Sequence, residues 1–106
     1  MTAGTTLRAL AEPNRQAIIE LLRAGELPVG ALVSGLSLSQ PAVSKHLRAL
    51  KDAGLVEVRV DAQRRFYRIR PDGLADLDAW LAGYRQLWED RVDLLEQHLN
   101  RRRSDD

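Results

Sequence analysis

Apolar residues recur every three or four positions through the first third of the chain, the spacing of helices that bury one side. Glu12-Pro13-Asn14 interrupts the pattern, because Pro13 disfavours helix at the preceding residue and suits the first turn of a new helix. Leu36-Ser37-Leu38 is long enough only for a turn. The pattern therefore predicts three short helices, over Thr5–Ala11, Asn14–Ala24 and Pro28–Gly35.

A longer helix is predicted from Ser39 to Gly54. The Ser39 hydroxyl can accept a hydrogen bond from an unpaired backbone N–H, and Pro41 falls in the first turn, where its missing N–H costs nothing. Gly54 can take the left-handed conformation that closes a helix. One apolar stripe runs along the helix, formed by Val43, Leu47 and Leu50. With the short helix and the turn before it, this segment predicts a helix-turn-helix. The alternative is an ordinary corner between helices, which any three-helix domain contains. It does not explain why the helix cap, the turn length and the charged face all fit a helix-turn-helix.

Strict alternation then replaces the helical spacing from Leu55 to Val60, and extended character resumes from Arg64 to Arg70 after a compact turn. This pattern predicts a β-hairpin. The hairpin directly follows the 39–54 helix, which is the recognition helix of the predicted helix-turn-helix, so we interpret it as a wing. Its basic side chains, Arg64, Arg65 and Arg68, lie where they can reach DNA phosphates or a minor groove. The alternative is a merely solvated hairpin, which fits less well with four arginines in seven residues and no matching acids.

From Leu74 the helical spacing returns and predicts a helix of about 27 residues, roughly 40 Å long. Its apolar stripe is wider than the core of a small domain requires and includes both tryptophans. The stripe is made of Leu74, Leu77, Leu81, Tyr84, Trp88, Leu95 and Leu99, with Trp80, Leu87, Val92 and Leu94 beside them. The dimer contacts predicted on it are Leu77, Trp80, Leu81, Tyr84, Trp88 and Leu95. We expect it to pair with a second copy of the chain; a helix folded back onto its own monomer is the alternative. Residues 101–106 are expected to form a disordered tail.

Length and composition narrow the class of protein. The 106 residues predict a single domain over residues 1–100, mainly α with a small β-hairpin, in the order α-α-α-α-β-β-α. The sequence shows no apolar span of membrane length and no leader segment. We therefore expect a cytoplasmic protein that does not associate with membranes and that lies at the nucleoid when it binds DNA. The absence of cysteine excludes disulfides and thiolate metal ligands. We expect no catalytic residues, no cofactor and no metal.

The net charge of +1 is spread unevenly. Gln40–Arg70 contains eight basic and three acidic residues, a net charge of +5, whereas the remainder contains eight basic and twelve acidic residues, a net charge of −4. A basic third on an acidic chain predicts localised contact with a polyanion. On the polar face of the 39–54 helix, Gln40 and Ser44 can hydrogen-bond base edges. The same face carries cations for phosphates, namely Lys45, Arg48 and Lys51.

Three segments, Ala9–Arg15, Leu38–Leu47 and Leu50–Val56, resemble the ArsR/SmtB family of winged-helix transcriptional repressors in order and spacing. The resemblance implies a homodimer paired through the first and last helices. Leu7 and Leu10 of the first helix are therefore added to the predicted dimer contacts. It also implies double-stranded DNA as the partner, with each recognition helix in a major groove of a pseudo-palindromic operator, often the promoter of the gene itself. The predicted DNA contacts are Ser39, Gln40, Ser44, Lys45, His46, Arg48, Arg64, Arg65 and Arg68. Although His46 could pack partly inward, the resemblance favours the DNA side.

The chain departs from the family's metal sensors. Pro28 and Gly30 stand where the resemblance places a Cys-x-Cys pair, and neither can ligate a metal. His98 alone lacks the paired spacing of the family's second metal site, so the resemblance is to the metal-independent branch. Ser37 replaces a usual turn glycine, and Ala62 stands where the wing tip often has one. A left-handed conformation at Ala62 would cost about 1 kcal/mol, so we expect a turn of another type.

Three functions fit these features to different degrees. The first is a dimeric, sequence-specific DNA-binding repressor. The second is a winged-helix module that contacts other proteins through its long helix, without specific DNA binding. An enzyme fits least, because no catalytic spacing, glycine-rich phosphate loop or cofactor motif is visible, and Ser44 and His46 point in different directions on their helix. An apolar small-molecule effector beneath Trp80, Tyr84 and Trp88 is a further hypothesis, with dimer core as the simpler interpretation of the same residues.

Overall fold

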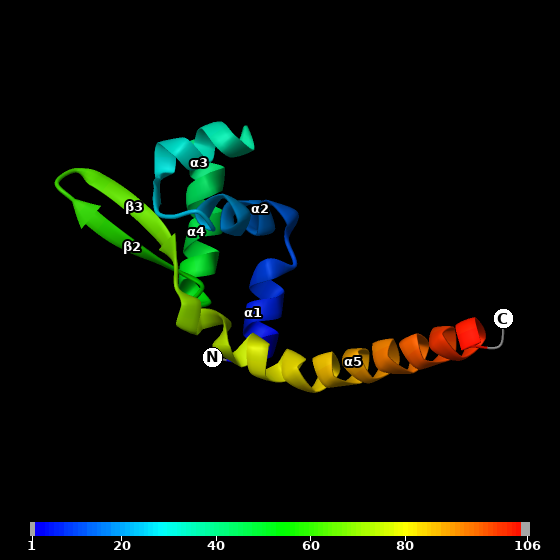
Figure 1. Cartoon of the computed structure of the whole chain (residues 1–106). Coiled ribbons are helices and arrows are strands. Elements are labelled where there is room, and N and C mark those ends of the chain that lie inside the picture. The colour runs from blue at the N-terminus through cyan, green and yellow to red at the C-terminus, as the bar shows by residue number, and fades with distance from the viewer. Residues whose placement is uncertain (1, 105–106) are drawn as a thin grey trace.

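The computed structural model describes residues 2–104 and has the predicted winged-helix order of elements (Figure 1). The predictions of a mainly helical fold and of a wing after the fourth helix are confirmed. In order along the chain, the elements are α1 (Ala3–Leu10), α2 (Pro13–Leu22), β1 (Leu27–Pro28), α3 (Val29–Leu36), α4 (Gln40–Asp52), β2 (Val56–Asp61), β3 (Arg64–Ile69), the 3-10 helix η1 (Pro71–Leu74) and α5 (Ala75–Ser104).

Side-chain caps mark the beginnings of α1, α2 and α4. Thr2 accepts a hydrogen bond from the Thr5 backbone N–H, so α1 begins two residues before the predicted start. The Glu12 carboxylate caps α2 in the same way by accepting from the Arg15 N–H at 3.1 Å. Ser39 caps α4 as predicted, with its hydroxyl 3.3 Å from the Ala42 N. Local sequence therefore specifies where these helices begin.

The core lies where α2, α3 and α4 meet the base of the wing. The predicted stripe of α4 is buried throughout, since Val43, Leu47 and Leu50 are at most 1% exposed. It packs in one cluster with buried side chains of the neighbouring elements, including Ile18, Leu22, Leu32, Leu55 and Val56. Burial of one side of α4 turns its opposite, polar side toward solvent.

The sheet has a third strand that periodicity does not reveal. β1 is only two residues long and pairs antiparallel with β3, so that Leu27 lies opposite Tyr67 and Pro28 opposite Phe66. The strand order is β1-β3-β2. A two-residue strand contains too few positions to show alternation, and only its partner defines it. It joins the wing to the segment that leads into α3.

Within residues 2–104, two residues other than glycine have a positive φ: Ser37, which ends α3, and Ala62 at the wing tip, both at 55°. The expectation that the turn at Ala62 avoids the left-handed region is wrong. Asp61 and Arg64 pair directly across the hairpin, which leaves a two-residue connection. Such short connections require positive φ to match the twist of the strands, so register outweighs the local preference of alanine.

α5 projects away from the body on the side opposite the wing (Figure 1). It packs on α1 near its beginning, and its remaining turns contact no other part of the described chain. The chain therefore extends 69 Å along its longest axis, with a radius of gyration of 19.5 Å against roughly 13 Å for a compact chain of this size. The alternative of a helix folded back onto its own monomer is not observed.

The end of α5 differs from the prediction of a tail from residue 101. The helix continues through Ser104, while residues 105 and 106 lie outside the described part of the chain. Arg101, Arg102 and Arg103 are good helix formers, and their charges favour the negative end of the helix dipole. Within residues 2–104, no helix has the length and apolar character needed to cross a membrane.

Candidate nucleic-acid interface

A groove of about 610 Å³ separates the first two turns of α4 from the wing. Gln40 and Ser44 of α4 line one side, and Arg64 and Arg65 of β3 line the other. These four side chains were predicted as DNA contacts from two separate segments, and the fold brings them to one concavity. Its remaining lining comes from Pro28, Val29, Gly30, Ala31, Gln63 and Tyr67.

The chemistry of the two walls differs. Gln40 and Ser44 present an amide and a hydroxyl on the exposed side of α4, where both can donate and accept hydrogen bonds. The Arg64 guanidinium lies 5.1 Å from the centre of the Phe66 ring, and a cation–π contact of this kind holds the charge on the wing surface. The groove therefore combines groups suited to base edges with groups suited to phosphates.

Beyond the groove, the outer face of α4 carries Lys45, Arg48 and Lys51, all exposed. Among the described residues, none of the three forms an ion pair with an acidic side chain, and the same holds for Arg64 and Arg65. Unpaired cations keep their full attraction for a polyanion. Ser39 is also exposed, but its hydroxyl is used for the helix cap.

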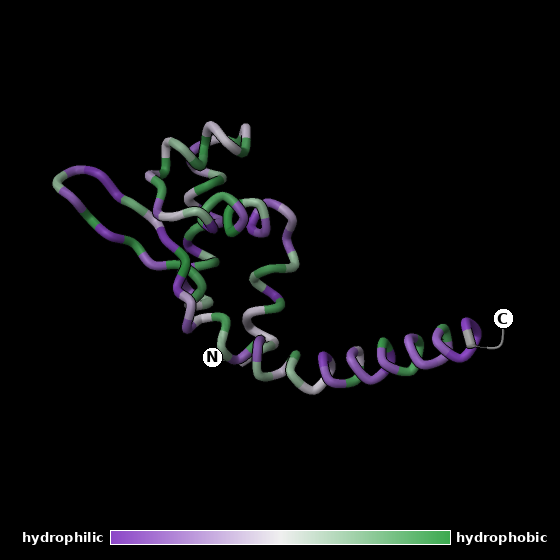
Figure 2. Tube along the Cα trace, in the orientation of Figure 1, coloured by the Kyte–Doolittle hydropathy of each residue, from purple (hydrophilic) through white to green (hydrophobic). Residues whose placement is uncertain are grey.

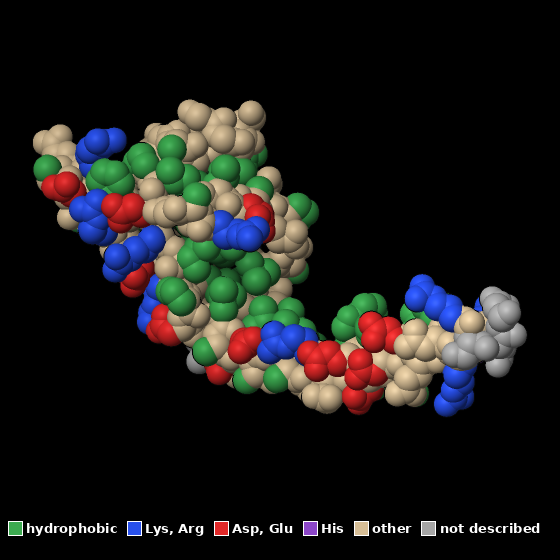
Figure 3. Space-filling view, in the orientation of Figure 1, with side chains coloured by type: hydrophobic (Ala, Val, Ile, Leu, Met, Phe, Trp, Pro, Cys, Tyr) green, Lys and Arg blue, Asp and Glu red, His purple; other side chains and the backbone are tan. Residues whose placement is uncertain are grey.

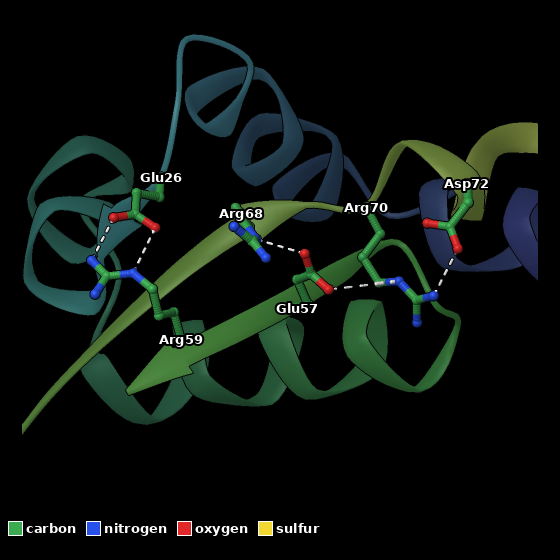
Figure 4. Close-up of polar contacts among 6 residues, drawn as sticks. All are labelled: Glu26, Glu57, Arg59, Arg68, Arg70 and Asp72. Atoms are coloured by element: carbon green, nitrogen blue, oxygen red, sulfur yellow. Dashed lines mark hydrogen bonds and ion pairs between the residues drawn. The ribbon is translucent and has the colours of Figure 1, made fainter. Parts of the chain in front are cut away.

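The prediction that the hairpin arginines lack matching acids is wrong for part of the wing (Figure 4). Arg68 on β3 donates a hydrogen bond to Glu57 on the paired position of β2. Arg70 pairs with Asp72 at 2.7 Å and lies 3.9 Å from Glu57. These acids lie on the neighbouring strand or beyond the hairpin, so counting charges within one strand does not reveal them. Arg68 is thus a weaker candidate for DNA contact than Arg64 and Arg65.

A second ionic contact ties the wing to the body. Arg59 donates two hydrogen bonds to Glu26, at 2.6 and 3.1 Å, from β2 to the residue before β1 (Figure 4). The hydrogen bond from Arg59 holds the pKa of Glu26 below its ordinary value. At the other end of the sheet, the hydrogen bond between Arg70 and Asp72 raises the pKa of the arginine and lowers that of the aspartate. Both carboxylates therefore stay ionised at neutral pH.

His46 was predicted on the DNA side, and its surroundings favour the inward alternative. Its side chain is 17% exposed, with Nδ1 3.8 Å from a Glu12 carboxylate oxygen. The Arg15 Nε donates to the same Nδ1 at 3.4 Å, while the Arg15 Nη1 donates to the Ala9 carbonyl oxygen. His46 therefore packs α4 against the junction of α1 and α2. One position before the buried Leu47, it lies at the edge of the inner face of α4.

The predicted dimer residues of α5 form an uncovered apolar face. Within the described chain, eight of the ten exposed large hydrophobic side chains lie on this helix. The most exposed is Trp88, at 71%, and the Trp80 and Tyr84 rings lie 4.9 Å apart. Apolar residues recur along the whole of α5 between polar ones (Figure 2). In contrast, Leu10 packs against the core of its own monomer and Leu77 is half-buried, so these two are only partly available to a partner.

Charge along α5 is also ordered. Acidic side chains dominate its first part and basic ones its end (Figure 3). Arg85 pairs with Asp78 at 2.7 Å. Open hollows along the apolar face are lined by Tyr84, Leu87, Trp88 and Arg91 on one side and by Trp88, Arg91, Val92, Leu94 and Leu95 on the other. A single helix cannot enclose a ligand, so any pocket here requires a second element.

The residues present do not fit a metal at the start of α3. Pro28 and Gly30 have no ligating side chain, and both line the groove instead. In the part of the chain that the structure describes, no group of three or more histidine, cysteine, aspartate or glutamate side chains is arranged to hold a metal ion.

Comparison with known proteins agrees with this geometry. Residues 12–58 match the family model for bacterial regulatory proteins of the arsR family. The chain is 46% identical over 94 residues to the HTH-type transcriptional regulator Rv2034 of Mycobacterium tuberculosis, an alignment that spans 81% of this chain and 88% of that protein. It is 37% identical over 84 residues to the arsenic resistance transcriptional regulator ArsR1 of Pseudomonas putida, over 78% of this chain and 66% of that one.

Solved structures give the same result. The crystal structure of a "possible transcriptional regulator for arsenical resistance" is similar with a TM-score of 0.67 and 42% identity, over 84% of this chain and 90% of that chain. An ArsR family transcriptional regulator is similar with a TM-score of 0.71 and 29% identity, over 81% of this chain and 89% of that one.

Proposed function

Because the chain belongs to the ArsR family of bacterial regulatory proteins, which are DNA-binding transcriptional regulators and not enzymes, we propose that it represses transcription as a homodimer bound to an inverted repeat. The observation that carries this proposal is the groove between α4 and the wing. In the proposed complex, α4 enters a major groove, where Gln40 and Ser44 contact base edges. Arg64 and Arg65 contact phosphates or the adjacent minor groove.

The exposed cations of α4 complete the proposed interface. Lys45, Arg48 and Lys51 would neutralise phosphates along the flanks of the major groove, which supplies affinity without sequence information. Arg68 and His46 have a smaller part in this scheme, because Glu57 pairs with the first and the α1–α2 junction surrounds the second. Specificity therefore rests on the first turns of α4.

The homodimer part of the proposal is supported by α5. Burying its apolar face would recover roughly 25 cal/mol for each Å² removed from water, and a second copy presents the same face. Leu7 is exposed on α1, the helix on which the start of α5 packs, and would add to the buried area in the dimer. A symmetric pair would then offer two recognition helices to successive major grooves about 34 Å apart.

Regulation in this proposal does not use a metal at α3, because Pro28 and Gly30 cannot ligate one. An apolar small molecule is the effector class that the α5 face would accept, lodged at the seam near Tyr84 and Trp88. Such a ligand would act by changing the separation of the two recognition helices. We place the protein in the cytoplasm, with its operator in its own promoter.

A mobility-shift experiment tests the proposal directly. The purified full chain is titrated against the DNA upstream of its own gene and against random DNA of equal length, at several salt concentrations. We expect protection of an inverted repeat, tighter binding than to random DNA, and a linear fall of log K with log salt. Equal, salt-insensitive binding to both DNAs would overturn the proposal and favour a protein-binding module.

A further inference from the structure

The segment that leads into α5 rests directly on the end of the recognition helix, with no side chain between the two backbones. Gly73 lies in η1, two residues before α5, and its backbone faces Gly54 at the end of α4. A Cβ on Gly73 would lie 1.9 Å from the Gly54 carbonyl oxygen, 2.8 Å from its carbonyl carbon and 3.2 Å from the Leu55 Cα. Because these neighbours are backbone atoms, they cannot rotate away. Only glycine fits at this position.

The Gly54 side of this contact is held firmly. Gly54 has a φ of 76° and donates its N–H to the Lys51 carbonyl at 2.9 Å. Leu55 donates to the Leu50 carbonyl at 3.0 Å, which completes the end of α4. The turn therefore moves with the recognition helix.

The Gly73 side is held equally well. Arg70 donates its backbone N–H to the Leu55 carbonyl at 2.9 Å, and Gly73 donates to the Arg70 carbonyl at 3.1 Å. The Arg70 side chain braces the same segment through Asp72 and Glu57 (Figure 4). A continuous path of short backbone contacts thus connects α4 to the start of α5.

From this joint we infer that Gly73 is a positioning residue, which sets the direction of α5 relative to α4 and thereby the separation of the two recognition helices in the dimer. The inference rests on the proposed function, since it takes α5 as the dimer helix. α5 has 30 residues and is about 45 Å long, so a small tilt at its beginning becomes a large displacement at its far end, as with a lever. Ordinary contacts begin near 3.4 Å, so a Cβ at residue 73 forces the backbones about 1.5 Å apart. That displacement tilts the lever and moves the partner's recognition helix.

The test measures which operator spacing the protein prefers. The wild-type full chain first selects its operator from a random duplex library, and the two half-sites are then separated or brought together in steps of one base pair. Gly73→Ala is compared with Gly83→Ala, because a Cβ on Gly83, within α5, meets nothing within 4 Å. Sedimentation and binding to random DNA are measured for both variants.

We expect Gly73→Ala to remain a dimer, to bind random DNA within about twofold of wild type, to lose about tenfold on the wild-type spacing, and to prefer a different spacing. Gly83→Ala should keep the wild-type spacing profile. An unchanged profile for Gly73→Ala, or an equal loss at every spacing, would overturn the inference, because a purely structural defect weakens all spacings alike.

A second variant keeps the inference testable if Gly73→Ala does not fold. Arg70→Gln removes the brace to Asp72 and Glu57 without adding an atom against Gly54, so we expect it to accept a wider range of spacings than wild type. A profile of wild-type width would overturn the inference. If wild type itself shows no spacing preference, the proposed dimeric repressor fails first, so the two failures are distinguishable.

Discussion

Arg59 on β2 clamps Glu26, the residue before β1, through two hydrogen bonds, while its guanidinium lies 4.6 Å from the centre of the Phe66 ring on β3. One arginine thereby joins both strands of the wing to the body of the domain. Arg59 lies in the basic segment Gln40–Arg70, so composition alone would predict that its charge contacts DNA, whereas it pairs with Glu26. It ties β2 to the residue before β1, next to the groove that Gln40 and Arg65 both line.

The clamp gives the first prediction. Arg59 lowers the pKa of Glu26 below the ordinary value of 4.5, so the stability that the pair contributes is fully present above about pH 4.5. It is lost as the pH falls through the lowered pKa. In Arg59→Gln the pKa of Glu26, followed by NMR titration of its side chain, should rise toward 4.5. Arg85→Gln, which disrupts only the pair with Asp78, should leave it unchanged; equal pKa values in wild type and Arg59→Gln would contradict this interpretation.

Two wing arginines should differ in their contribution to DNA affinity. We expect Arg65→Ala to weaken binding to operator and random DNA alike and to reduce the salt slope by about 1, because it removes one phosphate contact. Arg68→Ala should change the slope less, since Glu57 already neutralises that charge. Salt-dependent titrations of both variants measure the difference. A steeper loss for Arg68→Ala would reverse the assignment.

Gln40 should govern sequence preference. Gln40→Ala is expected to lower discrimination between operator and random DNA by about 1–3 kcal/mol, the usual value of a bidentate base contact, while binding to random DNA stays unchanged. Competition titrations with both DNAs provide the measurement. Should the substitution weaken the two equally, Gln40 would be a general contact and not a reader of bases.

The apolar face of α5 should hold the dimer together. Trp88→Asp places a charge in the proposed interface, so we expect a monomer by sedimentation at concentrations where wild type is dimeric. Asp90→Ala, on the opposite side of α5, is the matched control and should remain dimeric. A monomeric wild-type protein would remove the basis of this prediction.

The strained wing tip predicts a stabilising substitution. Ala62 has a φ of 55°, so Ala62→Gly should raise the free energy of unfolding by about 1 kcal/mol in urea denaturation at fixed protein concentration. Ala79→Gly, at an exposed position in the second turn of α5, should lower it by a similar amount. Destabilisation by Ala62→Gly would indicate that the turn depends on the alanine side chain.

The sequence by itself determined the features that depend on interactions between residues close together in the chain, namely helix ends, buried faces and the hairpin. Ser39 and Pro41 begin α4, Gly54 ends it, and Val43 and Leu47 define which side is buried, because capping, backbone freedom and periodicity act within a few residues. The alternation after Leu55 predicts the hairpin for the same reason. The same local signals place Gln40 and Ser44 on the exposed side of α4, although they do not say what lies opposite.

Tertiary structure alone decided the relations between distant segments. It paired Arg68 with Glu57, turned His46 toward Arg15, added β1 to the sheet and set Gly73 against Gly54. Each of these depends on where a remote part of the chain is placed, and no periodicity within a segment contains that information. The placement of α5 is also of this kind, because its first turns pack on α1 and the segment before it meets the end of α4 at a backbone contact between residues 19 positions apart.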